Sequence, residues 1–493
     1  MRPLRTLRSG AACGFALVFA GSAEAQALRP PALPTSEAEL PASLAVDVAA
    51  RGTPLPEVPP PPEFVSTRKR MSPADLAKKR EGIFPTGLPF LSSDPLNGFG
   101  GGATSYLHFN GTRADPLFAY APYRARIGVR VEYTTGNAAA LHLKLDVPFV
   151  AHSPWRLKLD AKHERAPNNL YFGLTEATLK ALPDASFDAY AKRLAQARAG
   201  GAGEAPIVSD KLRNYFLERE WMLNVKAERV LFDGNWRVLG GYEIQHLAYD
   251  TYEGTAVDAS GGLPGAPSRV PNGKSLLRED AETGRAFGLD GGRVSLLQLA
   301  LMYDTRDFDP DPSRGWFIEW ANEHSAKYLA SQFTFHKMLF QVRNFLPILR
   351  GTFRRTLLAT RLGYGTILGG RAPFFEFQDQ WSAEGSVRAL GGSQTLRGFK
   401  ANRFLGRTVA FANFELRHRI ADVTLLGQGF SFTVAPFLDL GGIGDRVLAV
   451  APKVRTAGGA GLRVAWNLST VIVADAAFSR EDRQFFLTFN NSY

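Results

Sequence analysis

Cysteine is almost absent from this sequence: Cys13 is the only one among 493 residues. It lies in an N-terminal stretch typical of a secretory signal, so the mature chain is expected to contain no cysteine. Disulfides, cysteine-based zinc sites and a cysteine nucleophile are therefore excluded. A lipoprotein signal is disfavoured, because Gly10-Ala11-Ala12 precedes Cys13 without a large apolar residue.

Long hydrophobic runs are also missing. After residue 25 no stretch reaches the roughly 18 uncharged apolar residues that a transmembrane helix needs. A membrane-spanning β-barrel remains possible, because each of its strands is apolar on one face only.

Catalytic motifs are the third absence. The sequence has no Gly-x-Ser-x-Gly elbow, no His-Glu-x-x-His and no Gly-Lys-Ser/Thr phosphate loop, and its eight histidines are scattered. We therefore predict no catalytic residue, no cofactor and no metal, and we expect that the protein is not an enzyme.

The N-terminal region has the features of an exported protein. Residues 1–25 have the charged, apolar and small-x-small regions of a signal peptide, ending at Ala23-Glu24-Ala25. Residues 26–83 are predicted to be a Pro-rich periplasmic linker, since ten prolines fall between Pro30 and Pro62. A short helix is expected from Ser72, a good N-cap, to about Arg80. Docking at a barrel mouth and a solvated tether are both compatible with this basic segment.

From about residue 84 the sequence alternates apolar and polar residues. Residues 123–133 place Ile127, Val129 and Val131 on one face and charged residues on the other. A soluble sandwich could show this pattern. The density of charge on the polar face, and the aromatics at strand ends such as Trp155, favour a wet lumen and a lipid-facing exterior.

Sixteen candidate strands follow from this alternation. They are residues 84–92, 98–109, 123–135, 139–149, 154–165, 212–230, 235–249, 293–305, 315–328, 332–347, 352–367, 407–420, 428–442, 455–466, 469–479 and 484–493. Long connections (166–211, 250–292 and 368–406) alternate with short turns, as in bacterial outer-membrane barrels. We therefore predict an all-β fold in which residues 84–493 form a 16-stranded antiparallel transmembrane β-barrel. Within the long connections, a surface helix is expected over 174–198 and a mobile segment over 254–274.

The most informative motif lies in the last long connection. Leu396, Arg397, Gly398 and Phe399 precede two strands, which place Glu415 and Asp439 on their polar faces. A buried guanidinium needs carboxylate partners, so Arg397 could pin an inward-folded loop to these two residues. The alternative is a surface loop with Arg397 in solvent.

A second charged cluster forms the turn between two strands. It contains Asp304, Arg306, Asp307, Arg314 and Gly315. Its carboxylates could suggest calcium, but the loop pattern ending in Glu is missing. Ion pairing around a tight periplasmic turn is the favoured interpretation.

These motifs resemble those of the bacterial surface antigen (BamA/TamA-type) superfamily. The Leu-Arg-Gly-Phe sequence is similar to that family's sixth-extracellular-loop motif, and Asp304 to Gly315 are similar to its Asp-x-Arg-Asp turn. The resemblance implies that Glu415 and Asp439 are the lumen partners of Arg397. It also identifies the last segment as an outer-membrane C-terminal signal, with Phe485, Leu487, Phe489 and Tyr493 on one face. The 26–83 region is too short and Pro-rich for a POTRA module.

The resemblance implies a protein of the bacterial outer membrane, reached by Sec export and signal cleavage. There it would help insert or translocate proteins or lipids. Its partners would be the lipid bilayer, an unfolded outer-membrane or secreted protein client, and a periplasmic adaptor. A passive or plugged pore, or a surface receptor, is the alternative. A third class, an outer-membrane hydrolase, would need a nucleophilic side chain at the lumen or its rim, and no residue of the sequence is a convincing candidate. The net charge of +11 is spread at strand spacing, so nucleic acid is not an expected partner.

Overall fold

The fold is known from a computed structural model. It describes residues 62–489, except 72–75, 77–78, 95–97, 177–178, 181–208, 233, 259–268, 308–310, 349–355, 426–427, 451–452 and 467–469. The predicted signal peptide, most of the linker and Tyr493 lie outside these residues.

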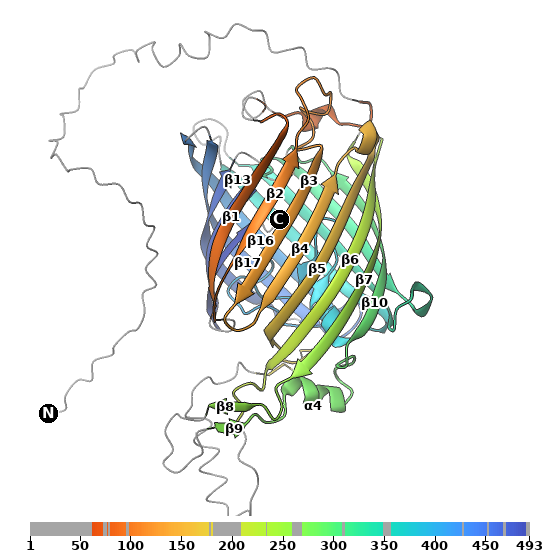
Figure 1. Ribbon diagram of the computed structural model, residues 1–493, viewed down its shortest axis with the longest axis vertical. Helices are drawn as coiled ribbons and strands as arrows, with labels where there is room; N and C mark the ends of the chain where they lie inside the picture. The colour runs from red at the N-terminus through yellow and green to blue at the C-terminus, as the bar shows by residue number, and fades with distance from the viewer. Residues whose placement is uncertain are drawn as a thin grey trace, which may run out of the picture. The chain divides into compact units, whose positions relative to one another are not determined.

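One antiparallel sheet of sixteen strands contains most of the described chain (Figure 1). The strands are β1 (Ile83–Asp94), β2 (Gly98–Phe109), β3 (Ala125–Thr134), β4 (Ala139–Val147), β5 (Trp155–Leu170), β6 (Tyr215–Leu231), β7 (Trp236–Thr251), β10 (Gly292–Asp304), β11 (Gly315–Ser325), β12 (Thr334–Pro347), β13 (Thr356–Arg371), β16 (Thr408–Leu425), β17 (Gln428–Gly444), β18 (Arg455–Trp466), β19 (Thr470–Phe478) and β20 (Arg483–Phe489). Each strand pairs with the next of these in sequence, so β1 and β20 end the sheet. The predicted all-β class and the sixteen strands are confirmed.

The two faces of the sheet have opposite chemistry. On β6, the outer face exposes Trp221, Leu223 and Val225, whereas the alternating residues Asn224 and Lys226 are buried. A soluble protein buries its apolar face. Here the apolar face is exposed and the charged face is enclosed, as in strands that separate lipid from a polar interior.

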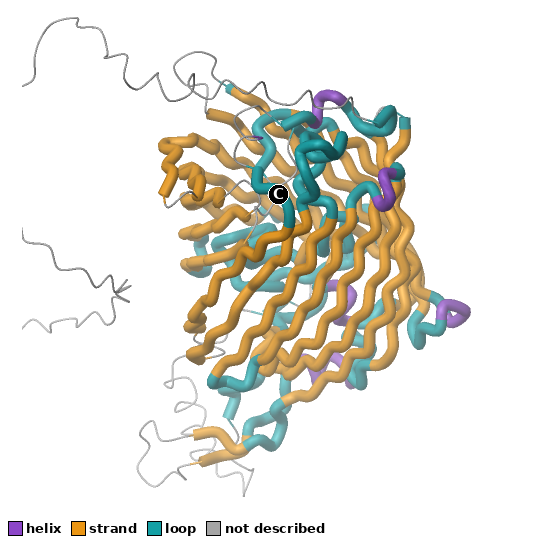
Figure 2. The backbone as a smooth tube through the Cα atoms, turned by 45° about the horizontal axis from the view of Figure 1, so that its top comes forward, coloured by secondary structure: helices purple, strands orange, loops and turns teal. Residues whose placement is uncertain are grey.

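The inner face is covered by the connection between β13 and β16. This connection contains the 3₁₀ turn η5 (Phe374–Phe377) and two short paired strands, β14 (Asp379–Gln380) and β15 (Val387–Arg388). Figure 2 shows the strands curving round these inner segments. The connection packs through Trp381, Leu390 and Phe404 against inward residues of several strands.

Several predicted boundaries and connections need correction. The strand expected at 315–328 ends at Ser325, where the 3₁₀ turn η4 (Lys327–Leu329) begins, and the strand expected from residue 407 continues to Leu425. Within the segment 254–274, expected to be mobile, β8 (Ala256–Asp258) pairs with β9 (Arg269–Pro271), and residues 259–268 lie outside the described residues. The helix α4 (Leu276–Glu282) was not predicted. The expected helix over 174–198 lies almost wholly outside the described residues.

Candidate functional site

Arg397 lies on the inner face of the sheet and is 1% exposed. Its Nε and Nη2 donate to the two carboxylate oxygens of Asp439, each over 2.8 Å. Its Nη1 donates to Glu415 Oε1 over 2.6 Å and to Asp475 Oδ2 over 3.1 Å. The guanidinium also lies over the ring of Phe437, 3.5 Å from its centre. A planar fork suits this geometry, because it can contact two carboxylates side by side.

The charges around Arg397 balance. Arg463 donates to Glu415 over 2.8 Å and also bonds Asp475, and Arg417 donates to Glu415 over 2.9 Å. Three arginines thus face three carboxylates, Glu415, Asp439 and Asp475, all buried. Removing one member of such a group leaves an unpaired buried charge, which typically costs about 3–5 kcal/mol.

Backbone geometry brings the loop to this position. Asn413, the direct partner of Asp439 across β16 and β17, donates to Asp439 over 2.8 Å and to the Thr395 carbonyl over 2.7 Å. The Gly398 carbonyl accepts from Ser479 Oγ over 2.7 Å. A Cβ at Gly398 would lie 2.7 Å from the Phe478 carbonyl carbon, so only glycine fits this approach to the end of β19. The flanking Leu396 and Phe399 are buried in the apolar core.

The same connection contacts a second part of the inner face through Glu384. The Glu384 carboxylate accepts from Arg343 Nη1 over 2.7 Å and from Arg306, and Arg237 Nη2 lies 3.4 Å away. Burial alone would raise the pKa of the Glu384 carboxyl, but these guanidinium groups hold it well below its usual range. Arg397 therefore fastens the connection to β16–β19, and Glu384 fastens it to β7–β12.

The residues of the predicted periplasmic turn fall into two groups. Asp304 and Arg306 are buried and paired with each other over 3.0 Å, and Arg306 continues to Glu384. Asp307 accepts from the Ser313 amide over 2.9 Å, and Arg314 points outward with its side chain 71% exposed. Gly315 has a φ of 112°, which favours glycine. Ion pairing accounts for the burial of Asp304 and Arg306, and through Glu384 it also links this turn to the connection between β13 and β16.

Residues 62–71 pack against the same end of the sheet. Lys69 Nζ lies 3.2 Å from Asp304 Oδ2, and the Met71 amide donates to the Ala119 carbonyl over 2.9 Å. Val65 is buried, and the Phe64 ring contacts that of Phe149 at 5.6 Å. This part of the expected linker is therefore docked, not a solvated tether.

A small cavity remains beneath this docked segment. Its volume is about 90 Å³, and Lys69, Arg156, Arg237 and Asp304 contribute to its lining. Each of these charged groups makes an ion pair within the described chain. The charged groups around this cavity are therefore paired with one another or with neighbouring side chains.

Next to the docked segment, Lys79 donates to the carbonyls of Phe118 and Ala121, both over 2.6 Å. Burial lowers the pKa of Lys79 to about 7, although Asp115 opposes the change. The connection between β2 and β3 is held against the preceding segment in this way.

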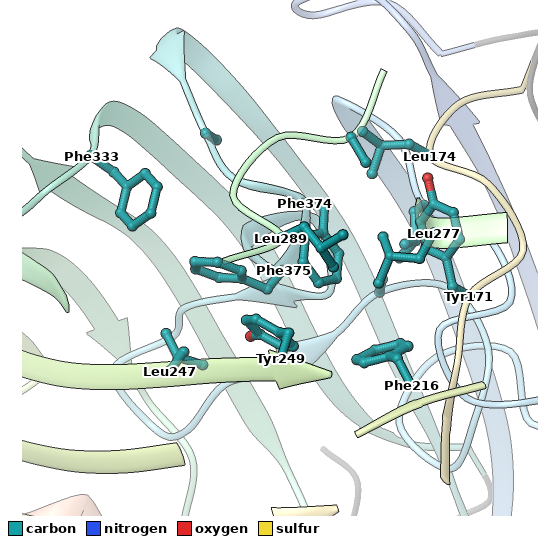
Figure 3. Close-up of a cluster of buried hydrophobic side chains, with 14 of the residues drawn as sticks. Tyr171, Leu174, Phe216, Leu247, Tyr249, Leu277, Leu289, Phe333, Phe374 and Phe375 are labelled. Atoms are coloured by element: carbon teal, nitrogen blue, oxygen red, sulfur yellow. The ribbon is translucent and has the colours of Figure 1, made fainter. Parts of the chain in front are cut away.

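The opposite end of the sheet is closed over by an aromatic cluster (Figure 3). Phe374 and Phe375 of η5 pack edge-on against each other, and Phe375 stacks on Tyr249 with 5.2 Å between ring centres. Leu277 of α4 and Phe216 of β6 complete the cluster. The long connections therefore have an apolar core of their own at this end.

The predicted C-terminal signal lies on the last strand. Phe485 and Leu487 are exposed on one face of β20, Phe489 is its last residue, and Tyr493 is outside the described residues. In the described part of the chain, no helix is long and apolar enough to cross a membrane. The same residues contain no cluster of three or more His, Cys, Asp or Glu side chains suited to a metal ion.

Sequence reasoning missed several members of these networks, among them Asp475, Arg463 and Glu384. Asp475 and Arg463 complete the group around Arg397, and Glu384 makes the second contact. A signal existed for Asp475, because it is the only charged residue of β19 and shares a face with Val471 and Val473. Glu384 gave none, since it lies in an irregular segment without periodicity.

Two family profiles match the chain. One is a domain of unknown function, DUF5982, over residues 61–124, and the other is the Omp85 superfamily domain over residues 125–483. The chain belongs to the Omp85 superfamily. This confirms the predicted BamA/TamA-type relationship, and neither matched profile is a POTRA module. Omp85 β-barrels are outer-membrane proteins, which agrees with the predicted location.

Solved Omp85 structures are similar to this chain at low identity. BamA from Haemophilus ducreyi lacking POTRA domains 1–3 is 12% identical, with 84% of this chain and 70% of that chain covered and a TM-score of 0.45. CdiB from Escherichia coli is 11% identical, with 84% and 62% covered and a TM-score of 0.48. CdiB from Acinetobacter baumannii is 9% identical, with 84% and 60% covered and a TM-score of 0.44. The chain thus spans less than two thirds of either CdiB chain. A comparison with curated proteins found no match.

Proposed function

We propose that this Omp85 protein closes into an outer-membrane β-barrel and assists the insertion or translocation of proteins or lipids. In this proposal β1 meets β20, residues 1–25 direct Sec export, and the connection between β13 and β16 is the inward-folded sixth extracellular loop. The exposed apolar face then contacts lipid, and the enclosed polar face forms the lumen.

The observation that carries the insertion role is that β1 lacks two backbone hydrogen-bond donors along its free edge. Pro85 and Pro89 in β1 have no N–H to donate. Gly82, just before β1, exchanges backbone hydrogen bonds with Asn110 and Gly111, and the register then stays constant along β1 and β2. Backbone groups alternate in direction along a strand, so Pro85 and Pro89 direct their nitrogens to the free edge of β1, where prolines are tolerated.

A weakly paired seam could act on a client directly. Unpaired backbone groups on an edge strand form hydrogen bonds with an incoming strand. The client would be an unfolded outer-membrane or secreted protein, and the docked segment 62–71 would face a periplasmic adaptor. In this proposal the connection between β13 and β16 is a lumen segment, and its contacts through Arg397 and Glu384 would keep the barrel from leaking while the seam opens.

A disulfide across the seam tests this proposal, and the cysteine-free mature chain makes the test clean. One cysteine in β1 and one in β20 would be screened for the pair that cross-links. We expect that the locked protein fails to complement a deletion strain, and that a reductant restores function. A control disulfide joins Leu88 and Thr104, direct partners in β1 and β2. Full complementation by the locked seam would contradict the proposal.

The second candidate function is a plugged pore, favoured by the fastening of the lumen segment at Arg397 and Glu384. Replacing Arg397 with Ala should then raise planar-bilayer conductance, because the segment loses one attachment. A deletion strain with normal assembly of other barrels would favour the pore over the insertion role.

A further inference from the structure

The excess positive charge of the chain is partly on its lipid-facing surface. At the ends of β5, β6, β7 and β10 that lead into the long connections, six outward-facing residues form one patch. We call them the outer cationic patch: His163, Arg165, Arg219, Trp221, His246 and Arg293.

Strand register places these residues side by side. His163 is the direct partner of Trp221, Trp221 of His246, and His246 of Arg293, so one row crosses four strands. The His163 ring stacks on Trp221 with 3.9 Å between ring centres, which fixes both on the same face. Trp221 is 61% exposed, so this is the outer face. Arg165 is the direct partner of Arg219 in the next row.

The residues that the structure describes balance the charges of the patch only in part. Arg219 pairs with Asp250, but in the described part of the chain neither Arg165 nor Arg293 makes an ion pair. Arg165 donates to the Asn137 carbonyl, and Arg293 donates to the Ala330 carbonyl over 2.6 Å. Two arginines directly opposite each other repel. Inside the lumen, by contrast, the three arginines around Arg397 face three carboxylates.

The order of residues along each strand matches the layers of a membrane. From the middle of β6 towards the patch, the outward residues are Val225, Leu223, Trp221 and Arg219 in that order, so apolar positions lead to an aromatic one and then to a cation. Hydrocarbon, interface and headgroup follow one another in the same order, and tryptophan concentrates at the interface. The arginines therefore lie at headgroup depth.

We propose that the outer cationic patch binds the phosphorylated headgroup of an anionic membrane lipid. This inference rests on the proposed membrane barrel but not on its insertion role. Guanidinium groups recognise phosphate by paired hydrogen bonds, and Trp221 and His163 offer a flat surface at the boundary with the acyl chains. The bound phosphate supplies the negative charge that Arg165 and Arg293 do not receive from the described part of the chain.

The test measures lipid retention by the folded, full mature chain in detergent. Native mass spectrometry compares binding of dioleoylphosphatidylglycerol with dioleoylphosphatidylcholine, which has the same acyl chains and a zwitterionic headgroup. We expect that the protein binds dioleoylphosphatidylglycerol more strongly than dioleoylphosphatidylcholine. An Arg165→Gln/Arg219→Gln/Arg293→Gln variant should bind it on the order of 10- to 100-fold more weakly, because each cation near an anionic lipid surface contributes about 1 kcal/mol.

Two further variants make the result decisive. Arg165→Lys/Arg219→Lys/Arg293→Lys keeps the charge and should retain most of the binding, even if the Gln variant folds poorly. Arg269→Gln/Arg446→Gln/Arg480→Gln removes three exposed charges from connections outside the sixteen-stranded sheet and should bind as the wild type does. The proposal is overturned if the two lipids bind alike, if the first variant binds normally, or if the control loses as much. Failure of the wild-type chain to fold in detergent would instead contradict the membrane barrel itself.

Discussion

Lys69 Nζ lies 3.2 Å from Asp304 Oδ2, which connects a segment preceding the first strand to the end of β10. Asp304 also accepts from Arg237 Nη2 over 2.8 Å and pairs with Arg306, which reaches Glu384. The N-terminal segment, the wall of the sheet and the lumen segment therefore share one charge network. Removing a charge at one of these three places should therefore alter the ion pairs at the other two.

The first prediction separates the two members of this pair. Lys69→Ala should release residues 62–71 with a small loss of stability, about 0.2–1 kcal/mol, because Lys69 is partly exposed. Asp304→Ala should cost about 3–5 kcal/mol, since it leaves Arg306 and Arg237 facing a buried gap. Trypsin cleavage near Arg70 and thermal unfolding in detergent measure the two effects. Equal unfolding shifts for both variants would contradict the ranking.

The second prediction concerns the attachment of Arg397. Glu415→Ala combined with Asp439→Ala should loosen the lumen segment, because the guanidinium loses its two strongest acceptors. New protease cleavage near Thr395 is the expected result. A Glu218→Ala variant, which removes an acid of β6 away from Arg397, serves as the control. Unchanged protection in the double variant would show that apolar packing alone holds the segment.

The third prediction tests the close approach at Gly398. Gly398→Ala should destabilise the protein by about 1–3 kcal/mol, as overpacking usually does, because its Cβ meets the backbone of Phe478 at 2.7 Å. Gly240→Ala is the matched control, since a Cβ at Gly240 has no atom within 4 Å. Denaturant or thermal unfolding in detergent should distinguish the two. Similar unfolding of both variants would mean that the segment moves aside without cost.

The fourth prediction is a pH dependence at Glu384. Its pKa is lowered in the folded state, because Arg306, Arg343 and Arg237 outweigh the effect of burial. The folded protein thus releases the proton more readily than the unfolded chain, so this contribution to stability is present above the unfolded pKa of about 4.3. It is lost as the pH falls below that value towards the folded pKa. Protection of the 381–388 segment from an acid protease should decrease over this range.

A Glu384→Gln variant supplies the control for that experiment. It cannot ionise at residue 384, so its protection should start lower at neutral pH and change less with acid. If wild type and variant lost protection in parallel, other carboxylates would be responsible for the acid sensitivity.

The strands could be predicted because their signal is local. Alternation of apolar and polar residues is visible in the sequence, for example along β6. Because alternate residues of a strand share a face, the same pattern predicted Glu415 and Asp439 on the inner surface. The structure brings both within hydrogen-bond distance of Arg397. Strand ends were less certain, as at Ser325 and Leu425, because hydrogen bonding to a neighbour extends or stops a strand regardless of its own pattern.

The sequence by itself determined the period of the strands, their number, the absence of cysteine chemistry and the family motif at Leu396–Phe399. Only the tertiary structure decided that Glu384 meets Arg306 and Arg343, that Lys69 meets Asp304, and that Arg165 and Arg219 stand side by side on the outer surface. Periodicity tells which face a residue occupies. The choice of partner across a lumen or between strands depends on register and on how the sheet curves, and these are set by the whole chain at once.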